Sequence, residues 1–151
     1  MTRKELYRTV LWSLSVLGVL AFIYTNSLMP ATASDAQSGE VFSLVSKLFP
    51  FLTHHLVRKL AHFSEYALLG AHFAFLPFLV PRRPIPMLAT ALVAGPLFAF
   101  ADEGLQRLVP GRSGNLADVF IDVLGYFCAA FIFFTVLFSV ALVRRKKHRA
   151  G

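Results

Sequence analysis

Side chains able to bind or transform a ligand gather in three clusters, each beside a long apolar run. The first cluster comprises Arg58, Lys59, His62, Glu65 and Tyr66, the second Asp102, Glu103, Gln106 and Arg107, and the third Arg112, Asp118 and Asp122. Ionisable groups beside apolar runs cost free energy, so they usually pair with one another and mark a functional site. We therefore predict that all of these residues except Arg107 contribute to ligand binding.

The basic members of the clusters suit an anionic ligand. They are Arg58, Lys59, Arg107 and Arg112. An arginine guanidinium presents a fork of N–H donors that matches the oxygens of a phosphate or a carboxylate. The clusters therefore predict a clamp for an anion.

The acidic members and the histidine suggest other chemistry. His62 and Glu65 are three residues apart and Asp118 and Asp122 are four apart, and such sets on facing helices hold metal ions in di-iron bundles. Four basic residues nearby argue against a bound cation, and the single Cys128 excludes a multi-cysteine site. We therefore expect neither a metal nor a cofactor. A proton relay is disfavoured because no acidic residue continues along the apolar runs.

One spacing suggests an enzyme. Arg112, five residues, Asp118, three residues and Asp122 resemble the last motif of membrane lipid phosphatases. Asp118 stands at the position of the essential histidine of that motif, and the other motifs of those enzymes are missing. An enzyme acting on a lipid or polyprenyl phosphate, with Glu65, Asp118 and Asp122 as candidate catalytic groups, is therefore an alternative.

The composition places these clusters in a membrane protein. Of 151 residues, 56% are hydrophobic, and the mean hydropathy is +0.63. About 20 apolar residues in a helix cross the hydrocarbon core of a bilayer. Four such runs predict transmembrane helices at approximately residues 7–28, 55–80, 85–106 and 116–143. The predicted fold class is a single all-α membrane domain over residues 1–151.

The charge distribution predicts the orientation. Ten of the fifteen basic residues lie near the N-terminus, at positions 82 and 83, and in the C-terminal tail. These positions flank apolar runs, where basic residues mark the cytoplasmic side, so we expect no nucleic-acid partner and place both termini in the cytoplasm. Four spans then bring the three clusters to one depth at the outer face. The alternative is an ion-pair network that only holds the helix ends together.

The remaining segments give smaller predictions. Residues 30–39 are small and polar and predict a loop, while residues 40–49 predict a short amphipathic helix in the membrane interface or, alternatively, a lid. Pro96 predicts a kink in the third span. The basic start, first apolar run and Ala-Thr-Ala at residues 31–33 also resemble a cleaved secretory signal, but the length of the run favours a retained helix.

Three ordered motifs cover the clusters. They read Arg58-Lys59-x-x-His62-Phe63-x-Glu65-Tyr66-x-x-Leu69, then Asp102-Glu103-x-x-Gln106, then Pro110-Gly111-Arg112-Ser113-Gly114 followed by Asp118, Asp122 and Gly125. Together they resemble the VanZ-like family of small bacterial membrane proteins, from about residue 24 to the end of the chain. The chain departs from the family pattern at Gly104-Leu105, where a histidine is common at the second position, and at Asp122, where asparagine is common.

The resemblance implies a multi-pass protein of the bacterial cytoplasmic membrane, of a type associated with resistance to teicoplanin and related lipoglycopeptides. We therefore expect a non-enzymatic role at the outer face, which is to bind or shield a cell-envelope lipid, a lipid-linked cell-wall precursor or a lipoglycopeptide. The alternatives are the lipid-phosphate enzyme and a purely structural accessory subunit.

Overall fold

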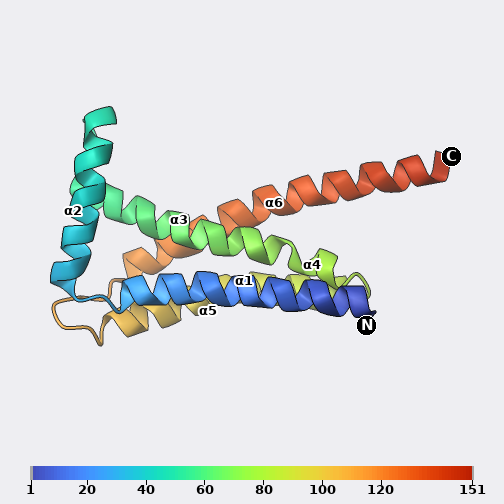
Figure 1. Cartoon of the computed structure of the whole chain (residues 1–151), viewed down its shortest axis with the longest axis horizontal. Helices are drawn as coiled ribbons and strands as arrows, with labels where there is room; N and C mark the ends of the chain where they lie inside the picture. The colour runs from blue at the N-terminus through green and yellow to red at the C-terminus, as the bar shows by residue number, and fades with distance from the viewer. Residues whose placement is uncertain (1, 151) are drawn as a thin grey trace.

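The computed structural model describes residues 2–150, and their side chains as far as Arg144. Within these residues every regular element is a helix, which confirms the predicted all-α class. The elements are α1 (Arg3–Ser27), α2 (Ala31–Leu48), α3 (His54–Ala74), α4 (Leu76–Leu79), α5 (Pro84–Gln106) and α6 (Leu116–Ala150). Helices α1, α3 and α5 form a bundle with the first half of α6, while α2 stands across one end and the second half of α6 projects beyond the bundle (Figure 1).

Three of these helices are long and apolar enough to cross a membrane, namely α1, α5 and the part of α6 from Leu116 to Arg144. Their outward faces carry large apolar side chains, such as Leu17, Leu97 and Phe131, each more than half exposed. Acyl chains would cover such faces in a bilayer. Helix α3, the fourth expected span, carries Arg58, Lys59 and Glu65, so a count of four spans stays a prediction.

The segment before α3 differs from the prediction. Residues 30–39 were expected to form a loop, but α2 begins at Ala31 and runs to Leu48. Pro30 precedes the first helical residue, and its backbone carbonyl accepts a hydrogen bond from the N–H of Ser34. The alanines of the first two turns favour a helix more than their polar neighbours oppose it. The helix expected over residues 40–49 is therefore the second half of a longer one.

Two prolines act differently from each other. The second apolar run was expected to be one helix to residue 80, but α3 ends at Ala74 and a single turn, α4, follows with Pro77 inside it. A proline ring clashes with the carbonyl one turn earlier and lacks an N–H, so the helix breaks there. Pro96 lies inside α5, which nevertheless runs unbroken from Pro84 to Gln106.

Close contact between α3 and α6 depends on two glycines. A Cβ atom added at Gly70 would overlap the backbone carbonyl of Tyr126, and one added at Gly125 would overlap the backbone carbonyl of Phe63. Tyr126 is fully buried, and its hydroxyl donates to the backbone carbonyl of Ala91 on α5 at 2.6 Å. Small residues let helix backbones approach in this way in membrane proteins.

Helix α1 docks on the bundle through Trp12. Its indole N–H donates to the backbone carbonyl of His72 at 2.8 Å, and its ring packs edge-on against Phe73 with the ring centroids 5.4 Å apart. The hydroxyl of Ser15 lies 2.8 Å from Nε2 of His72. Further along the helix Ile23 is fully buried. These contacts fix the N-terminal half of α1 to the last turns of α3, and Asn26 near its C-terminus donates to Glu65 of α3 at 2.7 Å.

We predict that Gly125→Ala and Gly70→Ala each lower the melting temperature in detergent, because the added methyl groups must push α3 and α6 apart. Overpacking of this kind costs about 1–3 kcal/mol. The fluorescence of Trp12, the only tryptophan, reports the unfolding. Gly18→Ala is the matched control, because a Cβ at Gly18 meets no atom within 4 Å. A Gly125→Ala protein as stable as Gly18→Ala would contradict the close helix contact.

Candidate functional site

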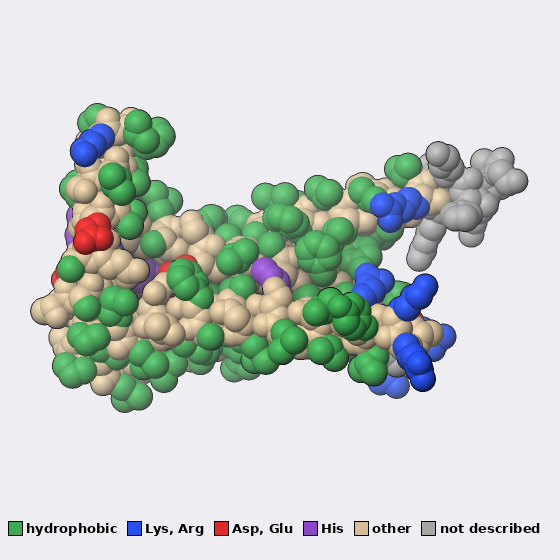
Figure 2. Space-filling model, in the orientation of Figure 1, with side chains coloured by type: hydrophobic (Ala, Val, Ile, Leu, Met, Phe, Trp, Pro, Cys, Tyr) green, Lys and Arg blue, Asp and Glu red, His purple; other side chains and the backbone are tan. Residues whose placement is uncertain are grey.

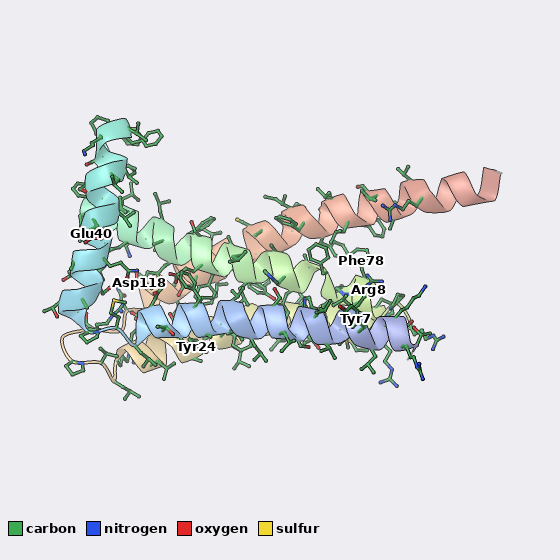
Figure 3. All side chains as sticks on the ribbon, viewed as in Figure 1. Tyr7, Arg8, Tyr24, Glu40, Phe78 and Asp118 are labelled. Atoms are coloured by element: carbon green, nitrogen blue, oxygen red, sulfur yellow. The ribbon has the colours of Figure 1, made fainter. Side chains whose placement is uncertain are left out.

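The structure brings the three clusters together at one end of the bundle, where α3 begins, α5 ends and α6 begins. Lys59 Nζ lies 2.6 Å from Asp118 Oδ1, which joins α3 to α6. Arg112 lies on the loop between α5 and α6, and the NH2 group of its side chain donates to Gln106 Oε1 at 3.1 Å. Figure 3 shows Asp118 near the end of the bundle where α2 and Glu40 lie, with Arg8 at the opposite end.

At the middle of the site lies a group that we call the buried centre, made of His62, Asp102 and Asp122. It takes one residue from each of α3, α5 and α6. Both aspartates have no exposed surface, and the histidine side chain is 18% exposed. One nitrogen or oxygen atom from each residue lies within 4.8 Å of the other two. Three potential ligand groups therefore share one small volume inside the bundle.

The buried centre has few hydrogen bonds. One oxygen of Asp102 accepts from Gln106 Nε2 at 3.0 Å. Its other oxygen, both oxygens of Asp122 and Nδ1 of His62 are buried without a hydrogen-bond partner among the described residues. His62 Nδ1 lies 3.6 Å from Asp122 Oδ1, which is too long for a hydrogen bond. Buried polar atoms are nearly always satisfied in folded proteins, so these atoms call for an explanation.

Arg112 joins the loop before α6 to the C-terminal end of α1 and is also influenced by the charge of Arg58. Its NH1 group donates to the backbone carbonyls of Asn26, Ser27 and Met29 at 3.0–3.4 Å, where the last carbonyls of α1 lack helical partners. Burial lowers the pKa of Arg112, and the positive charge of nearby Arg58 adds to the effect.

Two charged or polar contacts reach residues that the sequence analysis did not select. Arg58 NH1 donates to Asp35 Oδ1 on α2 at 3.0 Å, and Asn26 Nδ2 on α1 donates to Glu65 Oε1 at 2.7 Å. Asn26 stands at the polar end of an apolar run, as the selected residues do, so the same criterion would have found it. Asp35 was missed because its segment was expected to be a loop.

Three residues of the clusters, Tyr66, Glu103 and Arg107, have mainly structural contacts. Tyr66 is fully buried, and its hydroxyl donates to the backbone carbonyl of Phe98 at 3.0 Å. Glu103 is buried, and its Oε1 accepts from the backbone N–H of Asn115, which links α5 to the start of α6. Arg107 is exposed, and its side chain lies over Gly114.

A cavity of about 160 Å³ opens beside the buried centre, between α1, α2 and α3. We call it the amphiphilic pocket, because apolar and charged side chains both line it. The apolar lining includes Phe22, Val41, Val57 and Ala61, and the polar lining includes Asn26, Arg58, His62, Glu65 and Arg112. A second, mostly polar cavity of about 160 Å³ shares Ser34, Arg58 and Arg112 with it. The two arginines thus stand between two cavities.

We predict that the ion pair between Lys59 and Asp118 contributes measurably to stability, since both side chains are about three-quarters buried. Lys59→Met and Asp118→Asn should each destabilise the protein, and the double variant should lose less than the sum, with a coupling energy of about 1 kcal/mol or more. Unfolding followed through Trp12 measures all three variants.

The pair formed by Arg58 and Asp35 is the matched control, because these side chains are 43% and 56% exposed. Exposed pairs contribute about 0.2–1 kcal/mol at most. We therefore expect a smaller coupling for Arg58→Met with Asp35→Asn. Equal coupling in both pairs would show that burial does not distinguish them.

Comparison with known proteins identifies the family of the chain. A family model described as VanZ/LLP1 matches residues 12–139, which include every residue of the three clusters. No curated protein and no solved structure matches the chain. Because the family match extends over most of the sequence, from within α1 to within α6, the chain belongs to the VanZ/LLP1 family.

Proposed function

We propose that this membrane protein binds the anionic headgroup of a cell-envelope lipid or lipid-linked cell-wall precursor in the amphiphilic pocket, and so holds or shields it at the outer face of the membrane. The observation that carries the proposal is the lining of the pocket. It combines the charged side chains of Arg58 and Arg112 with apolar side chains such as Phe22 and Val41. A lipid likewise combines a charged headgroup with apolar chains.

The charges of the pocket favour an anion. Arg58 and Arg112 both line the pocket, so an anion bound in it would lie near two positive charges. Each guanidinium has five N–H donors. NH1 of Arg58 donates to Asp35, which leaves other donors of this half-exposed side chain for phosphate oxygens. Phosphate binding by paired arginines is a common solution in proteins.

The volume of the pocket limits what can enter. A cavity of about 160 Å³ holds several water molecules. That space suits a phosphate with a small substituent and excludes a whole lipid or glycopeptide. The chains of a bound lipid would therefore leave the pocket along the apolar surface of α1, where Leu14, Leu17 and Phe22 are exposed.

The proposed location follows from the distribution of charge. Most of the Lys and Arg side chains visible in Figure 2 gather at the end of the bundle that holds the N-terminus, whereas the Asp and Glu side chains visible there lie toward the end with α2. Basic residues mark the cytoplasmic side of a membrane protein. With α3 as a fourth span, the amphiphilic pocket faces outward, where lipid-linked cell-wall precursors and lipoglycopeptide drugs meet. The resistance role associated with VanZ-like proteins is consistent with such a site.

We predict that the purified protein binds farnesyl phosphate, a short polyprenyl phosphate, and that Arg58→Ala weakens this binding about tenfold or more, as expected for the loss of charge-assisted hydrogen bonds. Titration in detergent, followed through Trp12 fluorescence or by native mass spectrometry, measures the dissociation constant. Farnesol, which lacks the phosphate, should bind much more weakly.

Arg107→Ala is the matched control for this experiment. Arg107 lies at the same end of the bundle and carries the same charge, but it is exposed and does not line the amphiphilic pocket. Its replacement should leave the affinity unchanged. Equal losses for Arg58→Ala and Arg107→Ala would reduce the effect to general surface charge, and equal binding of farnesol would exclude headgroup recognition.

The orientation has its own test. In a Cys128→Ala background, Ser113→Cys on the loop between α5 and α6 should react with a membrane-impermeant maleimide in intact cells. Arg82→Cys, on the loop between α4 and α5, should react only after the membrane is opened. Both residues are exposed. The reverse pattern would place the pocket in the cytoplasm and exclude extracellular ligands.

A further inference from the structure

We propose that the buried centre of His62, Asp102 and Asp122 binds one divalent transition-metal ion, of the Zn²⁺ or Mn²⁺ type. This inference is independent of the lipid-binding function, because it rests on the interior of the bundle and is tested without a lipid. No metal was expected from the sequence, because four basic residues lie near the acidic ones. In the folded chain, three of these basic side chains bind other groups.

The spacing of the three groups suits a metal ion. Zinc binds histidine nitrogen and carboxylate oxygen at about 2.0–2.2 Å, which places neighbouring ligand atoms about 3.3–3.6 Å apart in a tetrahedral site. His62 Nδ1 and Asp122 Oδ1 are 3.6 Å apart, too far for a hydrogen bond and close to this separation. The candidate ligand atoms of all three residues lie within 4.8 Å of one another. Small side-chain rotations would complete the site.

The unpartnered oxygens are the second observation. Asp122 has no exposed surface, and neither of its oxygens has a hydrogen-bond partner among the described residues. The same is true of one oxygen of the fully buried Asp102. An ionised carboxylate in such a place is very costly unless a cation or hydrogen bonds compensate it. A metal ion between the two aspartates would supply that compensation.

The basic side chains of the clusters are engaged elsewhere. Lys59 pairs with Asp118, Arg58 pairs with Asp35, and Arg112 donates to backbone carbonyls of α1 and to Gln106. Arg107 is exposed and lies over Gly114. The four basic residues are therefore near the acidic ones in the sequence, but none of them forms an ion pair with Asp102 or Asp122. None of these contacts involves the unpartnered oxygens of Asp102 and Asp122.

The surroundings of Asp102 resemble the outer shell of a metal site. Gln106 Nε2 donates to Asp102 Oδ2 at 3.0 Å, and Gln106 Oε1 in turn accepts from Arg112. One oxygen of Asp102 is thereby held in place while the other remains available. Hydrogen bonds of this kind orient metal-binding carboxylates and are important for affinity.

The donor set favours a transition metal. One imidazole nitrogen with two carboxylates suits Zn²⁺ or Mn²⁺, whereas Mg²⁺ and Ca²⁺ prefer oxygen ligands throughout. Three protein ligands leave at least one coordination position for water or another ligand. His62 also lines the amphiphilic pocket, so the ion would lie next to it.

Metal analysis of the purified, tag-free protein tests the proposal. After treatment with a chelator and removal of the chelator, the protein is mixed with Zn²⁺ or Mn²⁺, desalted and measured by inductively coupled plasma mass spectrometry. We expect about one ion per chain for at least one of the two metals and a rise in melting temperature with metal concentration, because the ion binds the folded state. Mg²⁺ at the same concentration should produce neither effect.

Asp122→Asn, Asp102→Asn and His62→Gln should each reduce metal retention at least tenfold. Asp118→Asn is the matched control, since it removes a carboxylate one helical turn away that belongs to the pair with Lys59. Melting curves establish that each variant is folded, and any one of the three ligand variants suffices for the test.

Absence of retained Zn²⁺ and Mn²⁺ in the native protein, together with no rise in melting temperature, would overturn the proposal. So would equal retention by native protein and folded ligand variants, or an equal response to Mg²⁺. These outcomes do not depend on farnesyl phosphate binding, so the metal site and the lipid site can fail separately.

Discussion

The burial of two carboxylates beside an imidazole is the constraint on which the rest of the structure depends. Asp102 and Asp122 have no exposed surface, and charged groups in such surroundings destabilise a fold unless they are compensated. The contact between α3 and α6 brings the histidine to them. Gly125 lies one helical turn after Asp122 and packs against the carbonyl of Phe63, the residue after His62. The small residue at position 125 thus places the imidazole opposite the carboxylate.

The cations of the site lie around this centre and hold its parts together. Lys59 joins α3 to α6, Arg58 joins α3 to α2, and Arg112 joins the loop before α6 to the end of α1. The links made by Lys59 and Arg112 join segments that are far apart in the sequence, whereas Arg58 joins two consecutive helices. Arg58 and Arg112 also line the amphiphilic pocket, where they can contact an anion, while the carboxylates of the buried centre suit a cation. The proposed lipid and metal sites thus use different side chains.

Much of this arrangement could be predicted from the sequence. Two features, the helix α2 and the contacts of Arg112, could not, and each has a physical reason. The meeting of the three clusters followed from the alternation of apolar runs, because alternate loops of a bundle lie at the same end. The contribution of α2 was missed because small polar residues were expected to form a loop, although its alanines and the preceding Pro30 favour a helix. Arg112 was expected to bind a ligand, and its bonds to Asn26, Ser27 and Met29 depend on packing that no spacing in the sequence reveals.

The central claim is that the buried centre exists to bind something and not to stabilise the fold, and the stability of metal-free Asp122→Asn tests it most directly. Residues kept for function commonly reduce stability, so removing the buried charge should relieve a strain. The account predicts a melting temperature equal to or above that of the metal-free native protein, measured through Trp12. A fall of several degrees would contradict it, because Asp122 would then belong to a structural network that holds the helices together.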